Sequence, residues 1–149
     1  MKTRTKIQRA MKQFPLLTDF GVGLPYGIKV RQRNKKIKEG KQRLFERENQ
    51  FEAVCRWLEG IEKTEDINPY SSSYYLKHIA ENRLGLGHIS NGTLIAAAVH
   101  CGFKYKQGGN YPNLVFNMSA SSIHEAYKES LLYQKYPNNQ DLIHGGRMN

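Results

Sequence analysis

The sequence predicts a small α+β protein with a single domain, and three observations lead to this fold class. The chain has 149 residues, a length that suits one domain with a substantial buried core. Apolar residues recur at helical spacing in several segments, and two short segments on either side of residue 110 have the composition of a β-hairpin. The expected order is strand, three helices, hairpin and helix, which belongs to the α+β class.

Three regions are expected along the chain. Residues 1–25 are predicted to be a basic N-terminal segment with an apolar loop, residues 26–136 the α+β domain, and residues 137–149 a polar C-terminal tail. The first 13 residues are rich in Lys and Arg, which suits either a short basic helix or an arm without fixed structure.

The domain is expected to begin with a strand. In residues 26–33, Ile28 and Val30 alternate with Lys or Arg. This alternation predicts a half-buried strand with an apolar inner face and a cationic outer face.

The longest helix is expected over residues 41–63. Leu44, Phe51 and Leu58 recur every seven residues, and further apolar residues widen the stripe that they form. The pattern predicts one amphipathic helix. The polar segment over residues 64–70 is expected to end the helix, because Pro69 disfavours a helical residue before it.

Two further helices are expected on either side of a glycine-containing turn. Serines at positions 71–73 offer N-caps for a helix that Gly85 stops. The next helix is expected to begin at Ser90 or Asn91 and to end at Gly102.

The remaining elements are a hairpin and a last helix. Residues 103–107 and 114–119 are predicted to pair around a turn rich in Gly and Pro. Ser122 and Glu125 form a capping box that opens a helix to about Tyr136. Two helices joined by a turn and followed by a hairpin have the element order of a winged helix-turn-helix.

The net charge of +10 is confined to the first third of the chain. Residues 1–48 contain 14 Lys or Arg and 4 Asp or Glu, whereas residues 49–149 contain 9 of each kind. Positive charge that is segregated in this way attracts polyanions, chiefly nucleic acid, although an acidic protein surface would also satisfy it.

We therefore predict a non-catalytic protein that binds DNA or RNA, or a nucleoprotein complex. The basic strand and the helix after it would contact phosphates, and a second surface would lie at the N-terminus of the helix after Gly87 and on the hairpin. In a winged helix, this helix would be the recognition helix and the hairpin would be the wing. The expected binding residues are Lys29, Arg31, Arg33, Lys35, Lys36, Lys38, Lys41, Arg43, Asn91, Thr93, Lys104 and Lys106.

The candidates for catalysis are weaker. Residues 87–93 have the outline of a phosphate-binding loop, but Thr93 stands where such a loop needs Lys, so a helix stop and N-cap is the simpler explanation. A metal-free ribonuclease is an alternative, because histidines and lysines supply its general acid, base and cations. Its candidate residues are Lys77, His78, His88, His100, Lys104 and Lys106. The spacing of His and Cys fits no recognised metal site, and no cofactor or catalytic residue is expected.

A protein-interaction module is the other alternative. A basic surface can dock on an acidic or nucleic-acid-handling partner, as a small inhibitor or adaptor would. Residues 73–117 resemble the compact motif blocks of small accessory proteins of mobile elements, a resemblance that supplies no activity. Cys55 and Cys101 are far apart in the sequence and imply no disulfide framework, and free thiols suit the reducing cytoplasm, where we expect this protein. No apolar run reaches the length of a membrane span, so we expect no membrane partner.

Some of the nine tyrosines are candidates for stacking on unpaired bases. The alternative is that their rings close the edge of the core while their hydroxyls stay in water. The candidates are Tyr74, Tyr75, Tyr105 and Tyr111, which adjoin cations or turns.

Overall fold

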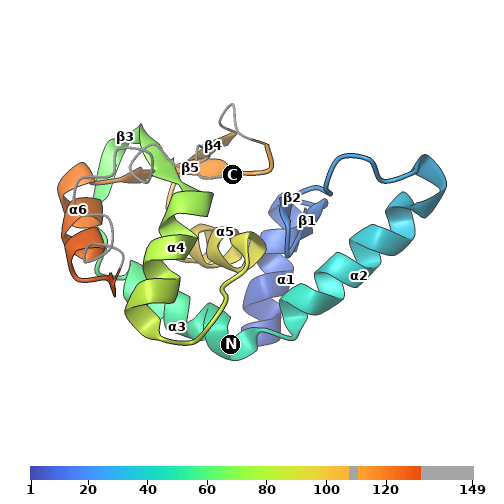
Figure 1. Cartoon of the computed structure of the whole chain (residues 1–149), viewed down its shortest axis with the longest axis horizontal. Coiled ribbons are helices and arrows are strands. Elements are labelled where there is room, and N and C mark those ends of the chain that lie inside the picture. Colours follow the sequence, from blue (N-terminus) through green and yellow to red (C-terminus); the bar gives the residue numbers. More distant parts are fainter. Residues whose placement is uncertain (108–110, 132–149) are drawn as a thin grey trace.

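The computed structural model describes residues 1–107 and 111–131, and it confirms the α+β class. Over these residues the chain forms six α-helices, one short 3₁₀-helix and two small antiparallel sheets, arranged as in Figure 1. The helices are α1 (Thr3–Gln13), η1 (Val30–Gln32), α2 (Arg33–Phe45), α3 (Glu48–Leu58), α4 (Ser73–Leu84), α5 (Asn91–His100) and α6 (Ala120–Lys128). The strands are β1 (Leu17–Thr18), β2 (Gly21–Val22), β3 (Lys63–Ser72), β4 (Tyr105–Gln107) and β5 (Leu114–Met118). The expected tail, residues 137–149, lies outside the described residues.

Helix α5 is at the centre of the core. Its residues from Asn91 to Ala98 are all buried, and α1, α3 and α4 pack around it (Figure 1). Alanines at 96–98 let these helices approach closely, because the distance between helix axes depends on the side chains at the contact. The first 13 residues adopt the helical alternative as α1, whose Ile7 and Ala10 lie in the same core.

The two helices around the glycine-containing turn form as predicted. The hydroxyl of Ser72 caps α4 by accepting a hydrogen bond from the Tyr74 amide, and Gly85 ends this helix in the left-handed conformation with φ of 65°. The hydroxyl of Ser90 caps α5 by accepting from the amide of Thr93 at 3.0 Å.

The expected hairpin is confirmed as β4 and β5, in which Tyr105 lies opposite Phe116. The sequence pattern does not predict β3, which pairs antiparallel with the other edge of β5. Its register shifts between Lys63 and Asn68 and again between Asn68 and Ser72. These irregularities remove the alternation by which a strand is recognised, and they accommodate Pro69.

The last helix begins earlier than expected. Ser119 follows β5 directly and caps α6, since its hydroxyl accepts a hydrogen bond from the Ser122 amide at 3.2 Å. The prediction that Ser122 is the cap is therefore wrong. The hydroxyl of Ser122 instead accepts from the amide of Glu62, which ties α6 to the start of β3.

The predicted strand over residues 26–33 is wrong. The segment is a loop that continues through η1 into α2, and the side chain of Val30 is 82% exposed. Among the strands of the described part of the chain, none pairs with the backbone of these residues. Alternation of apolar and charged residues predicts a strand only where one face has a core to cover, and this segment has none.

The single helix predicted over residues 41–63 is also wrong, because it divides into α2 and α3. The break lies at Glu46 and Arg47, where the backbone of Arg47 leaves the helical region with φ of −110° and ψ of 36°. Leu44 on α2 and Phe51 on α3 still bury the predicted apolar stripe in one core. The break contains neither Gly nor Pro, so the sequence carries no conventional signal for it.

Candidate nucleic-acid interface

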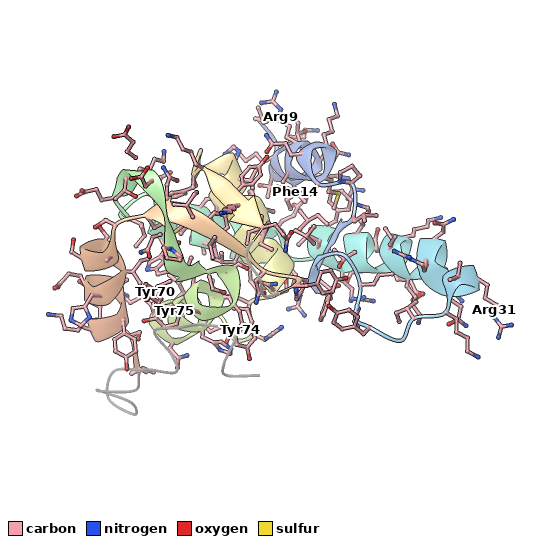
Figure 2. The ribbon with its side chains drawn as sticks, turned by 90° about the horizontal axis from the view of Figure 1, so that it is seen from above. Arg9, Phe14, Arg31, Tyr70, Tyr74 and Tyr75 are labelled. Atoms are coloured by element: carbon pink, nitrogen blue, oxygen red, sulfur yellow. The ribbon has the colours of Figure 1, made fainter. Side chains whose placement is uncertain are left out.

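The most basic part of the chain projects from the body of the protein. Residues 24–39, which we call the basic arm, comprise a loop, η1 and the distal half of α2. In Figure 1 α2 leads away from the helices of the core, and in Figure 2 Arg31 lies at its far end. The cations of the arm are Lys29, Arg31, Arg33, Lys35 and Lys38, which are exposed, and Lys36, which is partly exposed.

The proximal half of α2 is docked on the β1–β2 hairpin. A Cβ atom on Gly40 would lie 2.6 Å from the Cβ atom of Thr18, so the two backbones are closer than a side chain allows. The amide of Asp19 donates to the carbonyl oxygen of Gly40 at 3.3 Å. The buried residues of α2 are Gly40 and Leu44, both in this half. The arm is therefore anchored at one end and solvated at the other.

Two of the predicted binding residues belong to this anchor. The ammonium group of Lys41 donates to the carbonyl oxygen of Leu17 at 3.1 Å, and burial lowers the pKa of Lys41. The Nε atom of Arg43 lies 2.8 Å from Oδ2 of Asp19, and this hydrogen bond raises the pKa of Arg43. Lys41 and Arg43 thus hold the arm in place and are less free than the distal cations to bind an external phosphate.

The tip of the arm has an unusual charge distribution for the start of a helix. The first turn of α2 contains no acidic residue, and the side chain of Gln32 does not cap it. The amide of Arg33 donates to the carbonyl oxygen of Val30 in η1. The positive end of the helix dipole favours an anion at this position, whereas Arg33 and Lys35 add positive charge to it. An external anion such as phosphate would relieve this repulsion.

The N-terminus of α5, by contrast, is occupied by the chain itself. The Gly92 amide donates to the carbonyl oxygen of Asp19 at 3.0 Å, and the Asn91 amide group donates to the carbonyl oxygen of Phe20. Thr93 is fully buried and its hydroxyl contacts that of Ser90 at 2.8 Å. The expectation that Asn91 and Thr93 face a phosphate is therefore wrong.

The winged-helix interpretation fails for the same reason. The order α4, α5, β4, β5 is present, but α5 is buried along most of its length. A recognition helix needs an exposed face that enters a groove of the nucleic acid. Gly92 allows the backbone of Thr18 to contact α5, so its role is close packing within the core.

Lys104 and Lys106 lie apart from the arm. Both are exposed at the β4 edge of the sheet, and in Figure 1 the arm projects away from this sheet. The Nζ atom of Lys104 donates to the carbonyl oxygen of Glu65 on β3 at 3.3 Å. Tyr105, which points the other way, contacts Phe14 at 4.8 Å between ring centroids.

The histidines proposed for a ribonuclease occupy two separate places. His78 and His88 both approach Glu81, with Nδ1 to carboxylate oxygen distances of 3.4 and 3.2 Å. His100 lies at the other end of α5 and its ring is 5.9 Å from that of Phe51. His100 lies nine residues after Asn91 along α5, which corresponds to a helical rise of about 14 Å. The three histidines therefore do not form one site.

The carboxylate of Glu81 organises the turn between α4 and α5. It accepts from the ammonium group of Lys77 at 2.8 Å and from the amide of Ile89 at 3.0 Å. Burial alone would raise the pKa of Glu81, but hydrogen bonds from His78, Lys77 and Ile89 outweigh it and lower the pKa to about 2. The turn that resembles a phosphate-binding loop is thus tied to α4 by a partly buried carboxylate.

His100 lines a cavity of about 560 Å³ together with Lys6, Glu52 and Cys101. Burial, followed by the nearby charge of Lys6, lowers the pKa of His100. Lys6 and Glu52 form an ion pair at 2.8 Å. Among the described residues, no group of three or more His, Cys, Asp or Glu side chains has the arrangement of a metal site.

The binding residues predicted from the sequence include none from α1, although this helix also exposes cations. Its Arg9 and Lys12 are exposed, and the guanidinium of Arg4 lies 3.8 Å from the ring centroid of Phe45 at the end of α2. Figure 2 shows Arg9 on the outer face of α1. The high charge of the first 13 residues was the available signal, and α1 adds a second basic surface at the base of the arm.

In residues 1–107 and 111–131 no helix combines the length and the apolar character required to cross a membrane. No protein-family model, curated protein or solved structure matches this chain.

Proposed function

We propose that this chain is a non-catalytic nucleic-acid-binding protein whose basic arm contacts the phosphate backbone. One observation carries the proposal: six cations and a single acidic residue, Glu39, lie on an arm that protrudes from the body. Within residues 1–107 and 111–131, Lys36 is the only one of these cations with an ion pair, and its Nζ atom is 3.9 Å from Oε1 of Glu39. Cations without intramolecular partners are available to a polyanion.

The form of the arm supports the proposal. Thirteen residues of α2 extend about 20 Å at 1.5 Å per residue, and the distal half exposes its surface to solvent. An exposed helix of this kind has access to phosphates on both sides of a groove or along a single strand. Concentrating like charges at a solvated helix start weakens the helix, and such violations of local preference are expected at functional sites.

We place this activity in the cytoplasm. Cys55 and Cys101 are free thiols, and free thiols suit a reducing compartment.

A pair of substitutions tests the arm. Arg31→Gln with Arg33→Gln removes two distal charges, and we expect the affinity for DNA or RNA to fall by about tenfold at physiological salt. Fluorescence anisotropy with a labelled oligonucleotide measures this effect. Both side chains are exposed, so the helical circular dichroism signal should remain.

Arg56→Gln with Arg83→Gln is the matched control. Both residues are exposed on helices of the body, and their replacement changes the net charge of the protein by the same amount. The affinity should change by less than about threefold, because only long-range attraction is lost. Equal losses in the two double variants would show that net charge, and not the arm, governs binding. If the wild-type protein captures an acidic protein but binds no nucleic acid, the result would favour the inhibitor or adaptor alternative.

A further inference from the structure

Three aromatic rings meet on the surface at the start of the basic arm. Phe20 comes from the β1–β2 hairpin, Tyr26 from the arm itself and Tyr111 from the segment before β5. The ring centroid of Tyr111 lies 6.3 Å from that of Phe20 and 5.2 Å from that of Tyr26. The side chains are 36% (Phe20), 85% (Tyr26) and 40% (Tyr111) exposed. We call Phe20, Tyr26 and Tyr111 the aromatic cluster.

Tyr111 fixes the cluster to the backbone. Its hydroxyl accepts a hydrogen bond from the amide of Leu24 at 2.8 Å and donates one to the carbonyl oxygen of the same residue. Gly23 has a positive φ of 121°, and any Cβ atom there would collide with the Tyr111 side chain. Tyr26 therefore rests against a ring that is already held in place, and most of its own surface faces water.

The position of the cluster beside cations indicates its ligand. Lys29 follows Tyr26 by three residues, and three residues of extended chain span at most about 11 Å. Exposed aromatic patches mark either protein contacts or sites for unpaired bases. The cations that follow Tyr26 favour a ligand that combines flat apolar groups with negative charges, which describes a nucleic-acid strand.

We infer that the aromatic cluster stacks on unpaired bases of a single-stranded nucleic acid whose phosphates contact the basic arm, an inference that rests on the proposed function. Every base has a face on which an aromatic side chain can stack. In a duplex these faces are covered by neighbouring base pairs, so the cluster adds affinity only for single strands, loops or ends. The ligand class is accordingly single-stranded DNA or RNA, with little dependence on sequence.

The other tyrosines are placed differently. Tyr75 is 3% exposed and belongs to the core, and the ring of Tyr74 packs edge-on against His78. The hydroxyl of Tyr105 donates to the side chain of Gln13 at the end of α1. Of the four tyrosines that the sequence suggested for stacking on bases, only Tyr111 belongs to the aromatic cluster. The other two members, Tyr26 and Phe20, were not among those candidates.

Three ligands with equal numbers of phosphates per strand separate stacking from charge. They are an oligothymidylate of about 12 nucleotides, an abasic strand of the same length and a duplex of the same length. In Tyr26→Ala we expect the affinity for oligothymidylate to fall about tenfold, the usual effect of losing one stacked base. The affinity for the abasic strand and the duplex should change by less than about twofold. Tyr26→Phe, which retains the ring, should bind all three as the wild type does.

Tyr70→Ala is the matched control. Tyr70 is half exposed on β3, and in Figure 2 it lies far from the arm. This variant should bind all three ligands normally. An unchanged affinity of Tyr26→Ala for oligothymidylate, or equal losses on all three ligands, would overturn the inference. So would a wild type that binds the abasic strand as tightly as oligothymidylate.

The outcome also separates this inference from the proposed function. If Arg31→Gln with Arg33→Gln weakens binding while Tyr26→Ala does not, the basic arm still binds nucleic acid and the aromatic cluster does not stack on its bases. If the wild type binds none of the three ligands, both the inference and the proposed function are wrong.

Discussion

At the scale of single residues, Glu81 shows how a polar group can be structural in a place that suggests function. Its carboxylate receives hydrogen bonds from Lys77 and from the backbone of Ile89, while His78 and His88 flank it. The side chain of Lys77 is 8% exposed and its Nζ atom lies 2.8 Å from Oε1 of Glu81, so removal of this carboxylate would leave a buried ammonium group without its partner. The sequence indicates that His78 and Glu81 share a helix face, but it gives no sign that they anchor the turn before α5.

The pKa of Glu81 makes a prediction about stability. The pKa falls from 4.5 in the unfolded chain to about 2 in the folded protein. The charged carboxylate therefore stabilises the fold fully above about pH 5, and this contribution is lost as the pH falls towards 2. Glu81→Gln should lower the free energy of unfolding by about 2–3 kcal/mol at pH 7 and by much less at pH 2.5.

Urea denaturation at several pH values, followed by circular dichroism, measures this difference. Glu125→Gln is the control, because Glu125 is exposed and its ion pair with Lys128 lies on the surface of α6. The control should change the stability by less than about 0.5 kcal/mol at every pH. A Glu81→Gln variant as stable as the wild type at pH 7 would refute the anchoring role.

At the scale of elements, the β1–β2 hairpin joins the arm to the core. Gly40 of α2 packs on the side chain of Thr18 and Gly92 of α5 on the backbone of the same residue, each at a distance that excludes a side chain. The amides of Asp19 and Gly92 complete the contacts with backbone hydrogen bonds. The helices α4 and α5 were predictable from caps and glycines, because those signals are local.

Gly40→Ala tests this junction. In an isolated helix the substitution would stabilise by about 0.5–1 kcal/mol. Here a Cβ atom would lie 2.6 Å from Cβ and 2.9 Å from Cγ2 of Thr18, so we expect a net loss of about 1–3 kcal/mol. Thermal unfolding measures it, with the exposed Gln42→Ala on the same helix as a control that should be neutral or slightly stabilising. Stabilisation by Gly40→Ala would show that α2 does not dock on the hairpin.

The elements that the sequence does not predict depend on tertiary contacts. The break between α2 and α3 at Arg47 lets α3 stay packed in the core while α2 leaves it, and nothing local marks that position. β3 lacks regular alternation because its register shifts along β5. The alternation of apolar and cationic residues after Tyr26 is typical of a strand. A strand forms only beside another strand with which its backbone can pair, and whether one is present depends on the whole fold.

At the scale of the whole molecule, charge segregation was the informative feature of the sequence. The excess of Lys and Arg in residues 1–48 correctly identified the most basic region. It did not reveal that Lys41 and Arg43 serve as anchors, that Asn91 and Thr93 are buried, or that Tyr26 and Tyr111 meet. Each of these facts joins positions that are distant in the chain, which composition and spacing do not encode.

The salt dependence of binding tests the central claim most directly. Anisotropy titrations of a labelled duplex between about 50 and 300 mM salt give the slope of log Kobs against log salt concentration. If about five phosphates are neutralised by the basic arm, the slope should be about −4 to −5. In a variant with Arg31, Arg33, Lys35 and Lys36 changed to Gln, the slope should flatten to about −1. Binding of DNA and RNA that is absent, or that does not depend on salt, would contradict the proposal that this protein holds nucleic acid by its basic arm.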